Sequence, residues 1–509
     1  MSIFLKPVEN YKVYDPRIKL APEPSFHIEK GGQDISFYTE TSQNYSNSYC
    51  NFSVSVPSDR TIVDRNFKLK MKFRIKITAI QANQTQQNAP NFNITQFGDE
   101  NNDPQNRNKY ATVNEGYNAL RADPIASVTR TARLLLNNAE MAYEVNNSIA
   151  ALKRYKTTEN DVFKNLSMSP CFPDQTQTYG ELKETALNPL RGRNDSKGYD
   201  YPRGAFPIKF LGSFPVAPDV IPQGVEPRHI TETWEVELIE NLYVPPALFG
   251  DDEDSGFVGL TKFEVYLTFD PLEKMWCHIN NGLPANQNQS NAIKKPEIEL
   301  MPNPQLLVTF INPQATEFIP EKVYYPLYES LDRLTNIGTI PVGAQFSFVN
   351  NNIQLQEIPN RIYVFLSRSR LDNPDEKYLQ TDTFAGILNL SAKFNGVSGL
   401  LSGTTQPHLY QMSVKNGLNM SWRQFSRDVG SVVCIVPSED FGLQPNQSNG
   451  MEGQFNLQIE GTGINLNPQQ GGLNYDMHVV CIMEGILELS KGTAVKRMGV
   501  INEANILDP

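Results

Sequence analysis

Few residues of this 509-residue chain have the types and spacing that chemistry requires. Adjacent carboxylates are hard oxygen ligands, so the acidic run Asp251–Asp254 could attract Ca²⁺. The run lacks the alternating ligand positions of a calcium loop, however, and a solvated acidic loop is the simpler interpretation. We therefore predict no metal site here.

The histidines also lack a catalytic or metal-binding pattern. No His-x-His or His-Glu-x-x-His occurs, and a β-sandwich metalloenzyme normally shows a clustered His/Glu ligand set. The five histidines are instead scattered along the chain, at His27, His229, His278, His408 and His478. This distribution counts against a metalloenzyme.

Motifs for nucleophilic catalysis and phosphate binding are absent too. The sequence has no Gly-x-x-x-x-Gly-Lys loop, and Gly396–Gly399, the nearest approach to a Gly-x-Ser-x-Gly elbow, is better explained as a turn. Trp234, Trp276 and Trp422 are more typical of core or subunit-contact anchors than of sugar platforms. A carboxylate pair for glycoside hydrolysis needs only to meet in space, so the sequence leaves that alternative open. We predict no catalytic, cofactor-binding or metal residues and no small-molecule substrate.

The composition favours an all-β protein of two or more domains. Hydrophobic residues make up 39% of the chain, with 27 Phe and 21 Tyr, while 35 Pro and 32 Gly are spread as single residues. Such punctuation is typical of many short strands joined by turns and long loops. The net charge of −11 makes a general role in coating DNA electrostatically unfavourable.

Cysteine usage predicts folding in a reducing compartment. The cysteines are odd in number, widely spaced and without a Cys-x-x-Cys pair, at Cys50, Cys171, Cys277, Cys434 and Cys481. We expect reduced, partly buried thiols. The N-terminal residues lack the apolar core of a signal peptide, and no apolar run approaches the roughly 20 residues of a membrane helix.

The sequence contains one internal repeat. Val244-Pro245 with Phe249-Gly250 precedes an alternating strand from Phe263 to Leu267. Val436-Pro437 with Phe441-Gly442 precedes a similar strand from Phe455 to Ile459, and both parts recur 192 positions later (436 − 244 and 455 − 263). A fixed-period repeat predicts two similar β domains in tandem. Phe263, Val265, Leu267, Phe455, Leu457 and Ile459 should point into their own cores.

The strongest local charge feature is a basic row on one predicted strand. Residues 67–77 alternate strictly between apolar and basic side chains. One face therefore carries Phe67, Leu69, Met71, Phe73, Ile75 and Ile77, and the other carries Lys68, Lys70, Lys72, Arg74 and Lys76. A solvated sheet face is the favoured interpretation. Contact with nucleic acid, membrane headgroups or an acidic partner is the alternative.

The remaining elements agree with two sandwiches. Strands are predicted at 52–56, 127–136, 232–242 and 261–269, and again at 305–311, 344–349, 361–367, 386–394, 429–436, 454–460 and 477–489. A helix is expected near Ser148–Lys156, and a second is capped by Thr404 or Thr405 and ends at Asn416-Gly417.

The predicted organisation has five parts. They are an N-terminal extended arm (1–48), a first sandwich (49–278) with long insertions at about 81–126 and 157–228, a linker (279–303), a second sandwich (304–490) and a C-terminal arm (491–509). The first 20 residues carry more Lys and Arg than acidic residues. This arm is either a solvated tail or a contact to neighbouring subunits or an anionic inner surface.

Several segments of the second half resemble a known family. They are TDTF at 381–384, FNGVSGLLS at 394–402, YQMSVKNG at 410–417, RDVGSVVC at 427–434 and GQFNLQI at 453–459. Together they are similar to the second domain of double jelly-roll major capsid proteins of the tectivirus–adenovirus lineage, nearest to those of polinton-like viruses, virophages and adintoviruses. The specific similarity covers roughly residues 380–490. The rest of the chain matches in architecture.

This resemblance implies two tandem eight-stranded antiparallel jelly rolls with a few short helices. It implies a homotrimer with six jelly rolls, a pseudo-hexagonal capsomer that tiles an icosahedral shell. The insertions would form outward towers and the arms would tie capsomers together. Implied partners are neighbouring capsomers, penton and minor or cement proteins, and an inner membrane or genome through the N-terminal arm. The protein would fold in the host cytoplasm or nucleus, without secretion, and reside in the virion.

Two other functions remain as alternatives. A carbohydrate- or receptor-binding viral β protein, such as a spike, would show saturable glycan binding and would not form shells. A two-domain jelly-roll enzyme would lose a measurable activity on mutation of a carboxylate or His cluster. The missing ligand spacing favours the enzyme least.

Overall fold

The computed structural model describes most of the chain in separate stretches. They are 35–81, 118–157, 165, 168–171, 173–174, 176, 209–216, 228–242, 256–278, 291–293, 296–313, 321–369, 382–444, 447–467 and 472–499. The predictions for the arm before residue 35, for Val244–Gly250, for Asp251–Asp254 and for His27 lie outside these residues.

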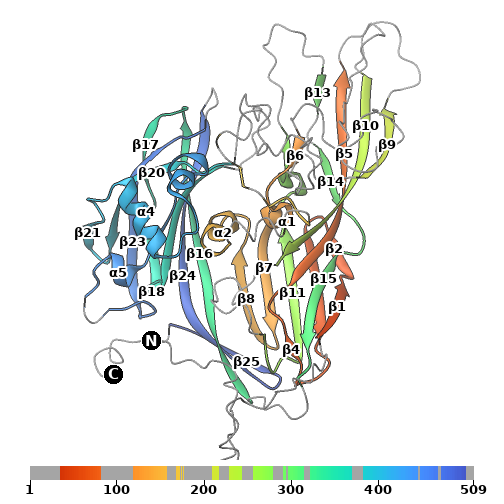
Figure 1. Cartoon of the computed structure of the whole chain (residues 1–509), viewed down its shortest axis with the longest axis horizontal. Helices are drawn as coiled ribbons and strands as arrows, with labels where there is room; N and C mark the ends of the chain where they lie inside the picture. The colour runs from red at the N-terminus through yellow and green to blue at the C-terminus, as the bar shows by residue number, and fades with distance from the viewer. Residues whose placement is uncertain are drawn as a thin grey trace, which may run out of the picture.

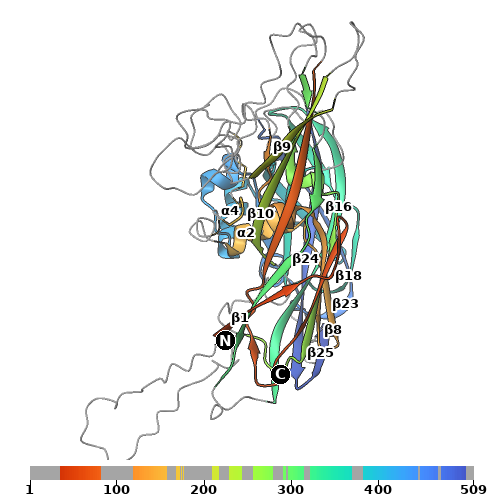
Figure 2. The ribbon, with the colours of Figure 1, turned by 90° about the vertical axis from the view of Figure 1, so that its right-hand side faces the viewer.

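Two β units lie side by side, the first coloured red to green and the second green to blue (Figure 1). The view turned by 90° shows their strands running along one common long direction (Figure 2). Strands with alternating apolar residues form both units, since burial along β11 (Lys262–Phe269) and β7 (Thr129–Leu136) follows a two-residue period.

The first unit packs two antiparallel sheets. One sheet has the order β1–β15–β5–β10–β9, and the other β2–β3–β11–β7–β8. Phe67 and Phe263 meet between them, with ring centroids 5.3 Å apart. The strand bounds are β1 Ile35–Thr41, β2 Asn44–Ser46, β3 Tyr49–Ser55, β4 Ile62–Val63, β5 Lys68–Gln81, β8 Ala139–Glu144, β9 Lys209–Val216, β10 Arg228–Asn241 and β15 Gln305–Ile311.

The second unit is built in the same way. Its sheets have the orders β16–β24–β19–β22 and β17–β23–β20–β21, with β18 also paired to β23 and β25 to β24. Phe346 stacks on Tyr475 between the sheets at 5.9 Å. The strand bounds are β16 Lys322–Ile340, β17 Gln345–Val349, β18 Ile353–Glu357, β19 Arg361–Arg368, β20 Gly386–Phe394, β21 Val397–Leu400, β22 Val432–Ile435, β23 Glu452–Ile464, β24 Leu473–Ser490 and β25 Thr493–Met498.

The two units share one topology, which confirms the predicted double jelly roll. In each unit the first strand (β1 or β16) lies at a sheet edge beside the last long strand (β15 or β24), followed by β5 and β10 in the first unit and by β19 and β22 in the second. The same hairpin, β7–β8 or β20–β21, precedes a helix, α2 (Ile149–Lys156) or α4 (Gln406–Lys415). Both helices were predicted, and α4 is capped at Thr405 and ends at Asn416.

The repeated stretch marks equivalent strands. β11 lies between β3 and β7, and β23 lies between β17 or β18 and β20. All six residues predicted to point inward, Phe263, Val265, Leu267, Phe455, Leu457 and Ile459, are buried. Their matched positions support the duplication.

The predicted domain boundaries differ from the strand pairing. β1, predicted to lie in the N-terminal arm, pairs with β15, predicted to start the second sandwich, and β15 pairs on with β5. β13 (Asn291–Ile293) and β14 (Glu297–Leu300), predicted as linker, both extend β5. Alternation identifies a strand but not its partner, so a strand that closes the first sheet was assigned to the second. We propose that the boundary falls between β15 and β16.

Other boundaries shift for the same reason. β9 lies inside the predicted insertion 157–228 yet pairs with β10. β6 (Asn118–Leu120) pairs with β12 (Trp276–His278), and α1 (Pro124–Val128) begins before the predicted end of the first insertion. β25, predicted as C-terminal arm, pairs with β24. The shorter elements are η4 (Leu272–Met275), η5 (Gln424–Asp428) and α5 (Pro437–Asp440).

Three of the five cations in the basic row of β5 pair with acidic residues on neighbouring strands. Lys70 and Lys72 both pair with Glu237 of β10, at 3.1 and 3.2 Å. Arg74 pairs with Glu299 of β14 at 3.5 Å. These side chains are partly exposed, so the structure favours the solvated sheet face over a surface for anions.

We expect these surface pairs to contribute little to stability. The Lys70→Met/Lys72→Met variant should change the free energy of unfolding by less than about 1 kcal/mol, because exposed ion pairs are solvated and screened. Chemical denaturation at pH 7 measures this. As a control on the opposite, buried face of β5, Phe73→Ala should cost about 3–5 kcal/mol. A loss above about 2 kcal/mol in the double variant would contradict the interpretation.

Candidate functional site: the interface between the two jelly rolls

Helix α2 of the first jelly roll docks directly on the second. The Tyr155 hydroxyl donates to the carbonyl of Val432 at 2.6 Å, and its ring packs edge-on against Tyr363 at 4.8 Å. The Arg154 guanidinium lies 3.8 Å from the Phe384 ring centroid and donates to the Gly430 carbonyl at 3.2 Å. Burial lowers the pKa of Arg154 to about 9, which leaves it charged at neutral pH.

The second jelly roll also completes the C-terminal end of this helix. Carbonyls in the last turn of a helix have no partner within the helix. The backbone N–H of Asn419 donates to the Arg154 carbonyl at 3.0 Å, and the Asn419 side-chain amide donates to the Tyr155 carbonyl at 2.7 Å. Two carbonyls in the last turn of the helix are therefore hydrogen-bonded by the second roll.

A buried ion pair joins the rolls beside α2. Arg121 donates to both carboxylate oxygens of Asp382, at 2.5 and 2.6 Å. The backbone N–H of Asp382 donates to the Asp174 carboxylate at 2.8 Å, and the Arg368 guanidinium lies 4.0 Å from Asp382. Arg121 and Asp382 are 261 positions apart, so only the fold brings them together.

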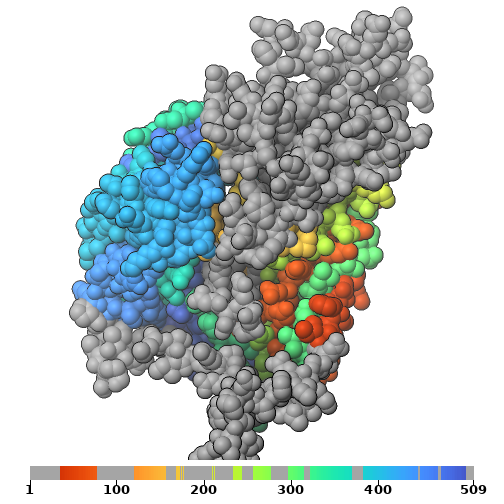
Figure 3. All heavy atoms as spheres, viewed as in Figure 1, coloured from red at the N-terminus to blue at the C-terminus, as the bar shows by residue number. Residues whose placement is uncertain are grey.

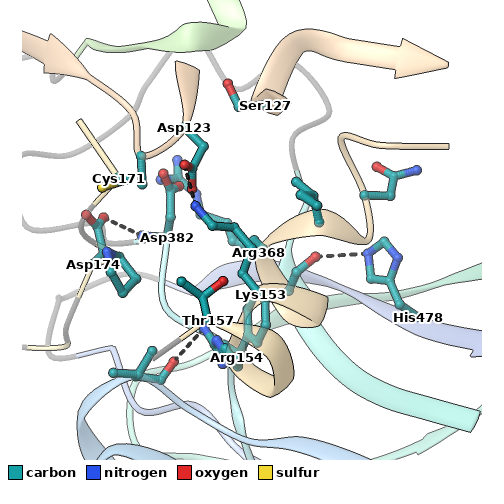
Figure 4. Close-up of a pocket in the computed structure, with 18 of the residues that line it drawn as sticks. Asp123, Ser127, Lys153, Arg154, Thr157, Cys171, Asp174, Arg368, Asp382 and His478 are labelled. Carbon is teal, nitrogen blue, oxygen red and sulfur yellow. Dashed lines mark hydrogen bonds and ion pairs between the residues drawn. The ribbon is translucent and has the colours of Figure 1, made fainter. Parts of the chain in front are cut away.

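A cavity of about 500 Å³ lies between these contacts and is lined by residues of both rolls. Figure 4 shows Lys153 reaching from α2 to Asp123, with Asp382 and Arg368 close by. The Lys153 ammonium is 2.5 Å from Asp123. The charged groups Lys153 and Asp123, like Arg121 and Asp382, thus pair with one another and have a structural role.

Glu240 anchors the first roll behind this cavity. Its carboxylate accepts from the backbone N–H groups of Ile125 and Ala126, both at 2.9 Å, and from the Ser169 hydroxyl at 2.8 Å. Burial raises the pKa of Glu240 to about 7, and the nearby charge of Asp123 adds to this. Protonation of Glu240 is therefore coupled to the folding of the first roll.

A second contact joins the rolls away from α2. The backbone N–H of Val258 donates to the Tyr325 hydroxyl at 2.9 Å, and that hydroxyl donates to the Gly256 carbonyl at 3.0 Å. The Arg65 guanidinium lies over the Tyr325 ring at 4.9 Å. Tyr325 belongs to β16, so the first strand of the second roll is held by the first roll.

The histidines that could take part in catalysis or metal binding make structural contacts instead. His408 accepts from the Thr405 backbone N–H of α4 at 3.4 Å, and His478 contacts the Ser367 hydroxyl at 2.9 Å and stacks on Phe365. His229 and His278 belong to β10 and β12. Within the described ranges, no group of three or more His, Cys, Asp or Glu side chains is arranged to hold a metal ion.

Other candidates are structural as well. Asn395 and Gly396 form the β20–β21 turn with positive φ angles, whereas Val397–Gly399, predicted as part of a turn, belong to strand β21. Trp234 and Trp276 are core residues, whereas Trp422 is 41% exposed and packs against Tyr410. Four cysteines are buried and free, and burial raises the pKa of the Cys50, Cys171, Cys434 and Cys481 thiols to about 12. No helix among the described residues is long and apolar enough to cross a membrane.

Sequence reasoning did not find this interface. Its partners lie in different halves of the chain, and no periodicity connects them.

Two family models match the chain. The model of the Sputnik virophage major capsid protein first domain covers residues 8–311. The model of the major capsid protein V20 C-terminal domain covers residues 325–429. The putative capsid protein V20 of Sputnik virophage is 28% identical over 534 aligned positions, which include 100% of this chain and 82% of that protein.

Two solved structures are similar over the whole chain. A chain in the cryo-EM structure of the Sputnik virophage matches with a TM-score of 0.76 and 26% identity, covering 100% of this chain and 97% of that one. The mavirus major capsid protein matches with a TM-score of 0.61 and 17% identity, covering 100% and 98%, and this likeness concerns the fold.

Gly430 tests the close packing of the second roll beside the docked helix α2. It has a φ of +94°, and an added Cβ would lie 2.1 Å from the Phe384 carbonyl oxygen. We expect Gly430→Ala to cost more than about 3 kcal/mol in denaturant unfolding, since both conformation and contact are lost. Gly396→Ala is the matched control, because its φ is +83° with no atom within 4 Å of the Cβ; it should cost about 1 kcal/mol. Equal losses would refute the packing argument.

The Arg121–Asp382 pair tests whether an ion pair between the rolls contributes to stability. Asp382→Leu should cost about 3–5 kcal/mol, because it leaves the Arg121 cation buried without its carboxylate. Adding Arg121→Met to Asp382→Leu should recover part of that loss, as both charges are then removed. A double-mutant cycle by chemical denaturation measures the coupling. Additive losses would mean that the pair does not act as a unit.

Proposed function

The chain belongs to the family of the Sputnik virophage major capsid protein, whose first-domain model spans more than half of it, and from this premise we propose that three copies associate into a capsomer of six jelly rolls. Its function is that of a major capsid protein, a structural subunit of a virion. The observation that carries the trimer proposal is the matched strand order of two rolls fixed side by side. Three such chains around a three-fold axis present six similar blocks, which is a pseudo-hexagonal outline.

Exposed edges support further association. β1 is the edge of its sheet, and its Phe37 and Ile35 are 87% and 59% exposed. An open edge strand with large apolar side chains is a liability that a neighbouring subunit would cover. The face in Figure 3 shows atoms of the first roll, red to green, on the right and atoms of the second roll, cyan to blue, on the left, and both reach the outer border of the molecule in this view.

The proposal extends to partners and to the place of folding. Neighbouring capsomers, penton proteins and minor or cement proteins are the expected contacts, and the basic N-terminal arm is the expected contact to a membrane or genome. The ion pairs of Lys70, Lys72 and Arg74 on β5 support a role for the arm over the sheets in any contact with anions. Four buried free thiols support folding in a reducing host compartment. The subunit acts by assembly, without catalysis.

The oligomeric state tests the proposal. Light scattering of the purified full chain should give three times the mass of the monomer, since three copies close the ring. Increasing the protein concentration should convert trimers into shells visible by negative-stain electron microscopy. A strict monomer at assembly concentrations, or a monomer that binds glycans saturably, would contradict the proposal and favour the receptor-binding alternative.

A further inference from the structure

A cluster of carboxylates lies at one end of the second jelly roll, away from the inter-roll cavity. Glu357 ends β18, Glu452 begins β23, and the two are direct cross-strand partners. Residues that face each other across strands carry their side chains on the same side of the sheet. Glu357 is only 6% exposed, and its buried Oε1 atom has no hydrogen-bond partner among the described residues.

The surrounding elements bring more acid than base to Glu357. Glu484 of β24 and Glu329 of β16 both act on its carboxylate, and one favourable contact comes from the Glu484 backbone N–H. The Glu484 side chain accepts from the Asn360 amide at 2.6 Å. An ionised Glu357 is therefore buried among three other carboxylates.

The nearby cations are engaged elsewhere. Lys496 pairs with Glu329, Arg497 lies 3.8 Å from Glu488, and Arg361 acts on Glu484. The ion pairs of Lys496 and Arg497 are thus with Glu329 and Glu488. Burying a charge without a partner is costly, so the neutral form of Glu357 is favoured.

The chain that follows β25 covers the cluster. An added Cβ on Gly499 would lie 2.9 Å from Glu357 Oε2, 2.9 Å from Glu452 Oε1 and 2.6 Å from Glu452 Cγ. Gly499 also has a φ of +64°, so a glycine is suited to this place in both conformation and size. Its backbone thus packs against both carboxylates and helps to shield Glu357 from water, while Glu452 stays exposed.

β25 is the element that can open most cheaply. It has six residues, pairs only with β24 and is largely exposed. Its anchors are the buried Ala494, whose backbone N–H donates to Asn138 of the first roll at 2.8 Å, and the Lys496–Glu329 pair. Short, exposed edge elements open locally at little free-energy cost.

We propose that Glu357, Glu452 and Glu484 form a proton-controlled switch for the C-terminal strand: protonated Glu357 keeps β25 and Gly499 seated, and ionised Glu357 releases them. Release lets water reach the carboxylate and also loosens the contact from Ala494 to the first roll. The inference stands on the fold of a single chain and does not depend on trimer formation.

The direction of the pH dependence follows from the electrostatics. Burial raises the pKa of Glu357 to about 7, the Glu484 backbone N–H opposes this, and the charges of Glu329, Glu452 and Glu484 add to it. A carboxyl whose pKa is raised on folding binds more protons when folded. Its stabilising contribution is therefore complete below its ordinary pKa of 4.5 and is lost as the pH rises through about 7.

Hydrogen exchange read by mass spectrometry on the full chain tests the switch. At pH 8.5, amides of residues 493–498 should exchange at least about tenfold faster than at pH 5.5, after correction for intrinsic rates. The reason is that pH 8.5 lies more than one pH unit above the pKa of Glu357, which is about 7. Glu357→Gln has the same size and cannot ionise, so it should keep the slow exchange at both pH values. A pH-independent wild type, or a Glu357→Gln variant that follows the wild type, would overturn the proposal.

Two further variants make the test specific. Glu240→Gln removes the other carboxyl with a pKa of about 7, and it should leave the pH response of β25 unchanged. If Glu357→Gln does not fold, Glu452→Gln should reduce the pH response, because the ionised Glu357 then faces one charge fewer. An unreduced response in that variant would overturn the proposal. So would restored protection at pH 8.5 on adding millimolar Ca²⁺, which would identify the cluster as a cation site.

Discussion

The double jelly roll depends on a helix that only its neighbour can complete. The last carbonyls of α2 need hydrogen-bond donors, and Asn419 of the second roll supplies them. Tyr155 and Arg154 of the same helix bond to the backbone of the second roll around β22. Separating the rolls would remove the protein partners of the last α2 carbonyls and of the Arg154 and Tyr155 side chains. The two sandwiches therefore behave as one body, and the cavity and the buried Arg121–Asp382 pair exist only within it.

One fold used twice serves two different purposes in this chain. Shared strand order makes the two rolls similar blocks, which is what a six-part ring of three chains requires. Their unlike parts perform the joining: α2 docks on the second roll, and Tyr325 of β16 docks on the first. Charges on the first sheet face are paired within the sheet, so the described surface there offers acids and bases together. The carboxylate cluster at the end of the second roll carries the proposed response to pH, which reaches the first roll through the contact of Ala494 with Asn138.

Much of the fold could be predicted, because two-residue alternation is a local signal. It located β5, β11 and β23 and the residues that fill both cores. It could not say which strands pair, so β1 and β15 were assigned to the arm and to the wrong roll. β16 was missed because Pro326 and a run of charged residues interrupt the pattern; as an edge strand it tolerates both. The interface was missed because its contacts join residues far apart in the sequence, such as Arg121 and Asp382, which are 261 positions apart.

The central claim is that the two jelly rolls form one cooperative unit joined through α2. Differential scanning calorimetry of the trimer-free monomer at low concentration tests this most directly. The account predicts a single transition whose calorimetric and van't Hoff enthalpies agree. Two resolved transitions, each with the enthalpy of one sandwich, would show that the rolls unfold independently and would contradict the account.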